Sequence, residues 1–308
     1  MKFAIRIPFQ GRAGADDVAR VVTAADEAGL DSGWLGDHLC FPVGEVRSRY
    51  PGTKSGSYMK SFDEVHLDPW CTLAYAAANS SRIGLGTGVT VLPYRHPIIV
   101  AKAVATVDHL SGGRAILGVA LGWVQEEFEA LGISFSSRVG RLEEGIAALR
   151  ALFETPTPEF HGEHFDFGPV YFSPKPVHGR VPIIIGANTE AARRRAGMLG
   201  DGFYGSRLPL EATRVAAREA RAAHADSPRH EQPFTVLIGY GVAFADDPPE
   251  AKTIVGPLEG LRDTALRYED AGADMLMLDT QAQRADDLLK VIEVVAPMVR
   301  VSEAPVTG

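Results

Sequence analysis

Length, composition and charge narrow the class of protein before any motif is considered. The chain has 308 residues, of which 45% are hydrophobic and 23% are charged. This is the composition of a globular protein with a sizeable core, and it excludes disordered and fibrous classes. The formal net charge of −8 argues against a nucleic-acid-binding surface and favours a small-molecule partner.

The cysteines and the apolar runs indicate the compartment. Cys40 and Cys71 form neither a CxxC pair nor a Cys/His cluster, so we expect no disulfide framework and no metal site. The starting segment MKFAIRIPFQ lacks the features of a secretory signal, and no apolar run approaches the roughly 20 residues needed to span a bilayer. We therefore expect a cytoplasmic protein with no membrane contact.

Short apolar runs rich in β-branched residues alternate with longer segments of helical period, which is the pattern of repeated βα units. In chain order the predicted elements are strand 3–7, helix 16–28, strand 32–35, helix 69–79, strand 82–89, helix 97–110, strand 115–119, helix 137–153, strand 182–186, helix 189–198, strand 202–205, helix 210–224, strand 235–244, helix 257–271, strand 274–278 and helix 286–299. Gly29, Gly112, Gly200 and Gly272 follow helices, where a left-handed residue is needed.

Eight βα units predict an α/β protein, a (β/α)8 TIM barrel that forms a single domain over residues 1–308. Two insertions interrupt the alternation of strands and helices. Residues 40–68 are rich in Pro and Gly and show no period, which predicts a long loop after strand 2. Residues 156–176 alternate aromatic residues around glycines, which predicts a β-hairpin before strand 5.

In such a barrel the active site lies at the carboxyl ends of the strands. Asp37 and His38 follow strand 2 and form the best acid/base candidate, because histidine titrates near neutrality. The structural alternative is that Asp37 caps the turn and His38 is a satisfied structural histidine. Thr87, Gly88 and Val89 follow strand 3, where glycine would let a flat ligand approach the backbone or would mark a β-bulge.

The remaining strand ends offer pocket walls and a possible phosphate site. Phe9 follows strand 1, and Gly122 and Trp123 follow strand 4. Residues 186–188 (Gly186, Ala187 and Asn188) lead into a helix, whose free N–H groups and dipole favour a phosphate, although many barrel turns are equally rich in small residues. No lysine ends a predicted strand and no acidic trio lines the strand ends, so the sequence favours an organic cofactor over Schiff-base or metal catalysis.

Several segments together resemble the bacterial luciferase-like flavin and deazaflavin oxidoreductases, among them GLDSGWLGDH, RIGLGTGV, AILGVALGW and VPIIIGANTEAARRRAG. The resemblance implies that Asp37 contacts the ring of coenzyme F420 and that His38 is catalytic beside its reactive carbon, as an acid/base or as an electrostatic stabiliser of the reduced ring. It implies a non-prolyl cis peptide between Gly88 and Val89 behind the ring, and phosphate contacts at residues 186–188. With it we assign the cofactor site to Asp37, Thr87, Gly88, Val89, Gly122, Glu126, Gly186, Ala187 and Asn188.

The same resemblance shapes the expected substrate. Sugar-phosphate dehydrogenases of the family carry a catalytic Glu where this chain has Trp123, so a sugar phosphate is not expected. Phe9, Phe41 and Trp123 would instead line a pocket for a flatter or more apolar small molecule. The family also implies a homodimer.

The family divides between users of FMN, typically two-component monooxygenases, and users of F420, which transfer a hydride. Gly36-Asp37-His38 is typical of the F420 users. The loop after strand 2 carries Arg47, Arg49, Lys54 and Lys60 against Glu45, a positive patch that suits a polyglutamyl tail, unless it is simply a solvated loop. We therefore expect an F420-dependent oxidoreductase. The alternatives are an FMN-dependent monooxygenase and a non-catalytic flavin-binding protein.

Overall fold

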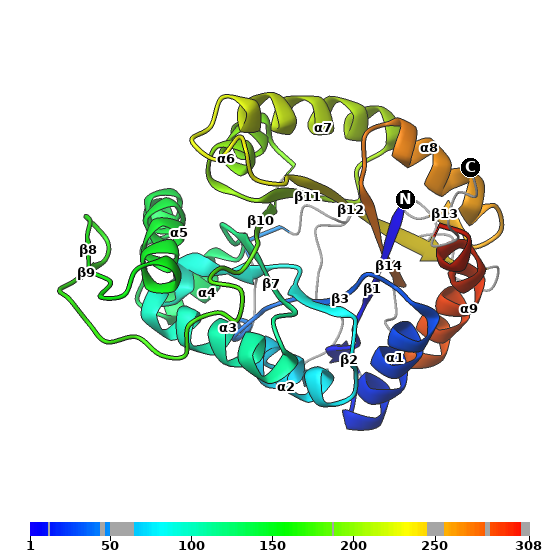
Figure 1. The fold of residues 1–308 in the computed structure, drawn as a ribbon, viewed down its shortest axis with the longest axis horizontal. Helices are drawn as coiled ribbons and strands as arrows, with labels where there is room; N and C mark the ends of the chain where they lie inside the picture. Colours follow the sequence, from blue (N-terminus) through cyan, green and yellow to red (C-terminus); the bar gives the residue numbers. More distant parts are fainter. Residues whose placement is uncertain are drawn as a thin grey trace.

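The computed structural model of the chain describes residues 1–11, 13–43, 47–49, 65–186, 188–244, 256–280 and 284–302. Eight parallel strands form a closed barrel that helices surround (Figure 1). Its strands are β1 (Lys2–Arg6), β3 (Ser32–Leu35), β5 (Gly84–Thr87), β7 (Ala115–Ala120), β10 (Ile183–Gly186), β11 (Gly202–Ser206), β12 (Thr235–Ala243) and β14 (Met275–Thr280). Pairing of β10 with β7 closes the ring, which confirms the predicted (β/α)8 fold.

The helices lie outside the barrel and cover its outer face (Figure 1). They are α1 (Ala15–Ala28), α2 (Pro69–Ala78), α3 (Pro97–Ser111), α4 (Gln125–Ala130), α5 (Arg138–Glu154), α6 (Glu190–Leu199), α7 (Leu210–Ala225), α8 (Leu261–Asp270) and α9 (Ala285–Ser302). Within the described ranges, no helix is both long enough and apolar enough to cross a bilayer.

Side chains alternate between the two faces of each strand. Phe3, Ile5, Leu276 and Leu278 pack in the large core beneath the helices, whereas Ala4, Trp34, Met275 and Met277 form a small cluster inside the barrel. By the same alternation, Arg6 and Asp279 face the barrel interior one step nearer the carboxyl ends of β1 and β14.

Glycine makes room inside the barrel for Trp34. A Cβ at Gly86 would lie 2.6 Å from Cε3 of that indole, so a larger residue would displace the ring.

The hairpin predicted before strand 5 is present, whereas residues 44–46 and 50–64 of the loop predicted after strand 2 lie outside the described residues. The loop after β3 returns as β4 (Val65–His66), which pairs with β2 (Gln10–Gly11), a strand pair that the sequence did not predict. The segment before β10 forms the predicted hairpin, in which β8 (Phe160–His161) pairs with β9 (Asp166–Phe167). The short pieces β6 (Thr90–Val91) and η1 (Leu92–Tyr94) connect β5 to α3, and η2 (Phe135–Ser137) precedes α5.

Two expectations about helix ends need correction. Gly29, Gly112 and Gly272 have positive φ, as predicted, but Gly200 is extended, with φ −94°. Glycine is needed there for a different reason, because a Cβ would lie 2.8 Å from the carbonyl oxygen of Ala196. The helix predicted from residue 257 begins only at Leu261, because Gly256–Pro257 pairs with β12 as β13.

Candidate active site

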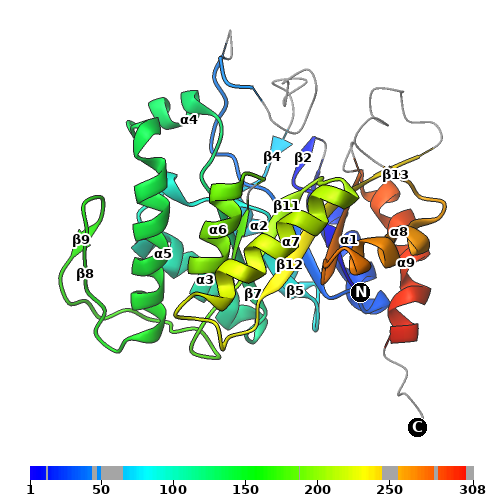
Figure 2. The same ribbon diagram turned by 90° about the horizontal axis from the view of Figure 1, so that it is seen from above.

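The carboxyl ends of the barrel strands open on one end of the molecule. The strand pair β2–β4 and the short helix α4 lie at this end in the side view (Figure 2). We call this end the mouth. The sequence-predicted site residues that the structure describes lie on the barrel strands, on the loops that leave them here or, in the case of Glu126, on α4.

His38 is fixed by a buried carboxylate at the mouth. Its Nδ1 lies 3.1 Å from Oε2 of Glu127, on α4, and the side chains of the two residues are 8% and 0% exposed. Because a carboxylate only accepts hydrogen bonds, it selects the tautomer of neutral His38 that carries the proton on Nδ1. In that tautomer Nε2 is the acceptor nitrogen of the ring.

Glu127 is itself held by three further donors. Oε1 accepts from the backbone N–H groups of Leu39 (2.6 Å) and Cys40 (3.3 Å), and Oε2 accepts from the Tyr94 hydroxyl (2.6 Å). Burial opposes ionisation of Glu127, but the hydrogen bonds from His38, Tyr94 and Leu39 outweigh it and lower its pKa. The carboxylate is therefore charged, and it locks both the His38 ring and the backbone that follows it.

Aromatic rings surround His38. The ring centroid of Phe41 lies 4.6 Å from that of His38, and the ring of Trp123 lies edge-on at 6.0 Å. His66, on β4, adds a ring 5.0 Å from Phe41 and 6.4 Å from His38. Burial and the neighbouring His38 lower the pKa of His66, so this second imidazole favours its neutral form.

Phe9, the third expected pocket residue, is 3% exposed and packs on the backbone of Gly36, where a Cβ would lie 2.6 Å from its ring. Phe41 and Trp123 therefore lie directly beside His38. Phe9 supports the backbone that leads to Asp37 and His38, and its expected contact with a substrate stays a prediction.

The Asp37 side chain is enclosed by the protein. It is 0% exposed and accepts two hydrogen bonds from the guanidinium of Arg95 (2.6 and 2.8 Å) and one from the N–H of Val91 (3.0 Å). Burial raises the pKa of this carboxyl, while the bidentate pair with Arg95 acts in the opposite direction and stabilises the charge. Both oxygens are thus engaged, and the predicted contact between Asp37 and a cofactor ring stays a prediction.

The peptide bond between Gly88 and Val89 is cis, as the sequence resemblance implied. Arg6 donates from Nη1 to the Gly88 carbonyl oxygen (2.9 Å), and the Gly88 N–H donates to Leu35 (2.6 Å). The Thr87 hydroxyl donates to the carbonyl of Gly118 (2.7 Å) and accepts from its N–H (3.1 Å). Thr87 therefore fixes β5 to β7 through its side chain.

The turn after β10 brings small residues to the mouth. A Cβ at Gly186 would lie 2.9 Å from Val89 Cγ1, so the two strand ends approach closely. Asn188 pairs with the backbone of Ser206 through both side-chain atoms (2.9 and 3.1 Å). Thr189, the N-cap of α6, gives its helix no side-chain cap hydrogen bond. Ala187 lies outside the described residues.

Gly122 and Glu126 shape the turn after β7. Gly122 has φ +80°, and a Cβ there would lie 2.6 Å from Val91 Cγ1. Glu126 accepts from the N–H groups of Arg47 (2.6 Å) and Ser48 (3.2 Å) and from the Ser48 hydroxyl (2.6 Å). Its expected contact with a cofactor stays a prediction, since these groups already engage both oxygens.

The expected positive patch is partly neutralised. The Arg47 guanidinium donates to Oε2 of Glu129 (2.6 Å), the third carboxylate of α4. Arg49 is described, whereas Lys54, Lys60 and Glu45 lie outside the described residues. The part of the patch that the structure describes therefore offers less free positive charge than the sequence indicated.

Sequence reasoning missed the residues that hold His38 in place. Glu127 and Tyr94 were not singled out, although the paired glutamates at the start of a short helix were a signal that one of them could turn inward. Nothing in the sequence around Arg95 or His66 indicated a role in the site, because only the tertiary fold brings η1 and β4 to the mouth.

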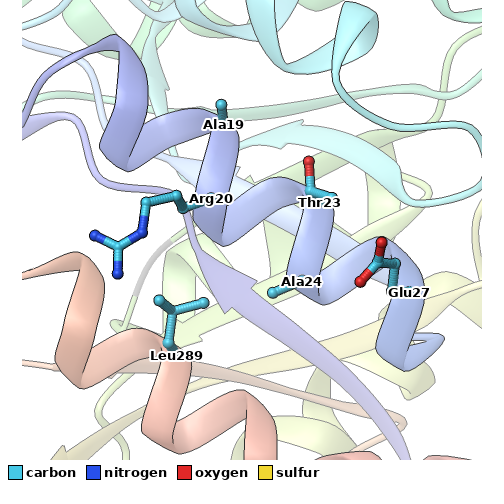
Figure 3. A pocket seen from close by; sticks show the side chains of 6 residues that line it. All are labelled: Ala19, Arg20, Thr23, Ala24, Glu27 and Leu289. Carbon is cyan, nitrogen blue, oxygen red and sulfur yellow. The ribbon is translucent and has the colours of Figure 1, made fainter.

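A groove on the outside of the barrel is not a candidate site. It lies between α1 and α9 and is lined by Ala19, Arg20, Thr23, Ala24, Glu27 and Leu289 (Figure 3). Arg20 pairs with Asp286 (2.6 Å) at this surface. The lining comes entirely from two outer helices, whereas the residues around His38 lie at the mouth.

Comparisons with known proteins agree with this geometry. The family model for luciferase-like monooxygenases matches residues 1–303. An F420-dependent glucose-6-phosphate dehydrogenase of Kineococcus radiotolerans is 31% identical over 243 residues, which cover 76% of this chain and 66% of that protein. The chain spans 60% of the length of uncharacterized proteins of Mycobacterium tuberculosis and Mycobacterium bovis, to which it is 37% identical over 170 residues.

Solved structures share the fold. Monooxygenase RslO1 from Streptomyces bottropensis superposes with a TM-score of 0.77 at 21% identity, covering 99% of this chain and 100% of that one. An F420-dependent secondary alcohol dehydrogenase, solved with an F420-acetone adduct, also gives 0.77, at 17% identity and with coverage of 97% and 99%. With the family model spanning almost its whole length, the chain belongs to the luciferase-like monooxygenase family.

Proposed function

We propose that this protein is a coenzyme F420-dependent oxidoreductase that transfers a hydride to or from a small organic substrate at the mouth of the barrel. The observation that carries the proposal is His38, which the buried Glu127 holds through Nδ1 beside the rings of Phe41 and Trp123. The F420-dependent dehydrogenase among the curated relatives supports the choice of cofactor.

The chemistry of His38 follows from its partner. A neutral imidazole with its proton fixed on Nδ1 can take a proton from a substrate hydroxyl at Nε2, or return it in the reverse direction. Glu127 stabilises the imidazolium that results, because the carboxylate keeps its charge. Phe41, His66 and Trp123 shield this proton transfer from water.

The mouth suits a flat cofactor. Val89 approaches the backbone of Gly186 so closely that glycine is required, and Arg6 fixes the Gly88 carbonyl. We propose that residues 88 and 89 support the ring and that Asp37, Thr87, Gly122 and Glu126 act by holding the surrounding loops. The bound cofactor would supply the hydride carrier that the side chains lack.

The turn at residues 186–188 would hold the phosphate. The first turn of α6 has N–H groups that its own N-cap side chain does not satisfy, and the helix dipole favours an anion there. Asn188 fixes the turn to Ser206 and so keeps these N–H groups in place.

Titration with purified cofactors tests the proposal. A cofactor bound beside His38 should quench tryptophan fluorescence, because Trp123 lies next to that ring. If the protein uses F420, F420 should quench at concentrations where FMN does not. His38→Ala should lower turnover about 100-fold while cofactor affinity stays nearly unchanged. Quenching by FMN alone would replace the assignment by the second candidate, an FMN-dependent monooxygenase, which the family description and the fold shared with RslO1 favour. Binding without turnover over a broad panel would indicate a non-catalytic flavin-binding protein.

A homodimer is part of the proposal. Three apolar side chains on the neighbouring helices α2 and α3 are exposed, namely Tyr75 (41%), Ile99 (65%) and Leu110 (62%). We propose that a second copy covers this face. Light scattering should give twice the chain mass, and Ile99→Asp should shift the protein toward the monomer.

A further inference from the structure

A second group of polar side chains lies at the mouth, away from the cluster around His38. Asp279 near the end of β14 is 8% exposed, Arg6 at the end of β1 is 7% exposed, and Arg207 follows β11 directly. Asp279 and Arg6 face the barrel interior. The group therefore combines one acidic side chain with two basic side chains, and none of them takes part in the proton transfer proposed for His38.

Asp279 has one oxygen without a donor. Oδ1 is buried and accepts no hydrogen bond from any residue that the structure describes. Oδ2 lies 3.6 Å from Arg6 Nε and 3.8 Å from Arg207 Nη2, which is too far for a hydrogen bond. On the neighbouring strand β12 the residue in register is Gly241, which has no side chain to offer. Buried acceptors are nearly always satisfied, so Oδ1 calls for an outside donor.

Arg207 is held in a conformation that arginine seldom adopts. Its φ is +51°, in the left-handed region, and its backbone N–H donates to Gly239 (3.0 Å). Within the described ranges its guanidinium makes the 3.8 Å contact with Asp279 and no hydrogen bond, and its side chain is 19% exposed. Backbone strain of this kind is retained where it positions a functional group.

We infer that Asp279 and Arg207 bind a polar group of the substrate that presents an N–H donor next to a carbonyl acceptor, as an amide or lactam does. The N–H would donate to Asp279 Oδ1 and the guanidinium of Arg207 would donate to the carbonyl oxygen. Arg6, already committed to the Gly88 carbonyl, stabilises the charge of Asp279. This inference deepens the proposed function and rests on it, since it names the substrate class of the same mouth.

The chemistry disfavours the two closest alternatives. An ester or lactone has the carbonyl but leaves Oδ1 without a donor. A carboxylate would satisfy Arg207 but would bring a second negative charge against Asp279, and it too would leave Oδ1 without a donor.

A matched pair of probes tests the inference. We would titrate the F420-saturated protein with 2-pyrrolidinone and with γ-butyrolactone, which differ by one N–H in place of an ester oxygen, and with butyrate, following binding by saturation-transfer NMR. The lactam should bind about 10-fold more tightly than the lactone, the discrimination expected of one hydrogen bond to a charged group. Equal affinity for lactam and lactone, or tighter binding of butyrate, would overturn the inference.

Variants assign the preference to these residues. Asp279→Asn should reduce the lactam preference to about 2-fold or less, and Arg207→Leu should weaken both probes. Arg214→Leu, which removes an exposed pair with Asp270 on the outer surface, is the control and should bind like the wild type. Retention of the full preference by Asp279→Asn would also overturn the inference. The wild-type comparison decides the question if a variant fails to fold.

The same titration separates this inference from the cofactor assignment. A lactam preference seen with FMN-loaded or cofactor-free protein, in the absence of F420 binding, would support the Asp279–Arg207 site and remove F420. Normal F420 turnover without a lactam preference would overturn the site alone.

Discussion

Replacing Glu127 by Gln tests how the site is held together. The side chain keeps its size, but the carboxylate that accepts four hydrogen bonds becomes an amide with one acceptor oxygen. The amide oxygen is expected to keep the N–H groups of Leu39 and Cys40. Its NH₂ group then faces His38 Nδ1 and the Tyr94 hydroxyl, where it must donate.

The magnitude follows from these contacts. Hydrogen bonds to a charged group are worth about 1.5–3 kcal/mol and neutral ones about 0.5–1.5 kcal/mol, so the loss of charge weakens each bond by about 1 kcal/mol. The Glu127 side chain is 0% exposed, so the variant no longer has the cost of burying a charge, and this offsets part of the summed loss in hydrogen bonding. We expect a net loss of about 2 kcal/mol in the free energy of unfolding.

The effect on turnover should be larger than the effect on stability suggests. An NH₂ group that donates to Nδ1 selects the opposite tautomer, so Nε2 carries the proton and can no longer accept one from the substrate. We expect turnover to fall about 100-fold, measured well below the melting temperature of the variant. Nitrogen chemical shifts of the His38 ring should report the change of tautomer directly.

A control on the same helix isolates the effect. Glu129→Gln removes an exposed carboxylate that pairs with Arg47, and it should leave both turnover and the His38 shifts unchanged. Wild-type turnover in Glu127→Gln would refute the reasoning, because the tautomer of His38 would then be irrelevant to the reaction.

Three further predictions concern the surroundings of the site. Asp37→Asn breaks a bidentate pair with Arg95 whose side chains are 0% and 10% exposed, and it should cost about 3–5 kcal/mol in chemical denaturation. Gly118→Ala should cost at least about 1–3 kcal/mol, since its Cβ would lie 1.8 Å from the Thr87 carbonyl oxygen, whereas Gly168→Ala, with open space around it, should cost little. The hydrogen bonds from Ser48 and from backbone N–H groups outweigh desolvation and lower the pKa of Glu126 to about 2. The ionised carboxylate therefore stabilises the folded protein fully above its ordinary pKa of 4.5, and this contribution is lost as pH falls toward 2. The difference in melting temperature between wild type and Glu126→Gln should therefore shrink across that window, and a constant difference would contradict the assignment.

The fold could be predicted because each βα unit has a recognisable pattern of hydrophobic residues within its own stretch of sequence. The strands at residues 115–119 and 182–186 are apolar throughout, and eight such runs alternate with helical periods, which leaves few topologies. The boundary at Pro257 was missed because pairing with β12 overrides the helical period. Likewise, Gly200 was assigned the left-handed role of its neighbours, although crowding by backbone carbonyls explains it.

The candidate site could be predicted only in part, because strand ends are visible in a sequence and side-chain partners are not. Asp37 and His38 were selected as an acid/base pair, yet the structure gives each its own partner, Arg95 for the former and Glu127 for the latter. These partners come from loops after other strands, and their spacing along the chain carries no periodicity. Local patterns therefore find a candidate site residue more readily than the residue that holds it in place.

Arg95 and Glu127, the partners of Asp37 and His38, are linked through η1. Asp37 can therefore influence the site although its own side chain is buried. Asp37 holds Val91 and Arg95, the residues on either side of η1. That turn carries Tyr94, whose hydroxyl holds Glu127, and Glu127 holds His38. The residue next to His38 in sequence thus acts on it through a circuit of buried hydrogen bonds. Loosening any member should shift the His38 ring before it unfolds the barrel, because each hydrogen bond of the circuit joins segments outside the eight barrel strands.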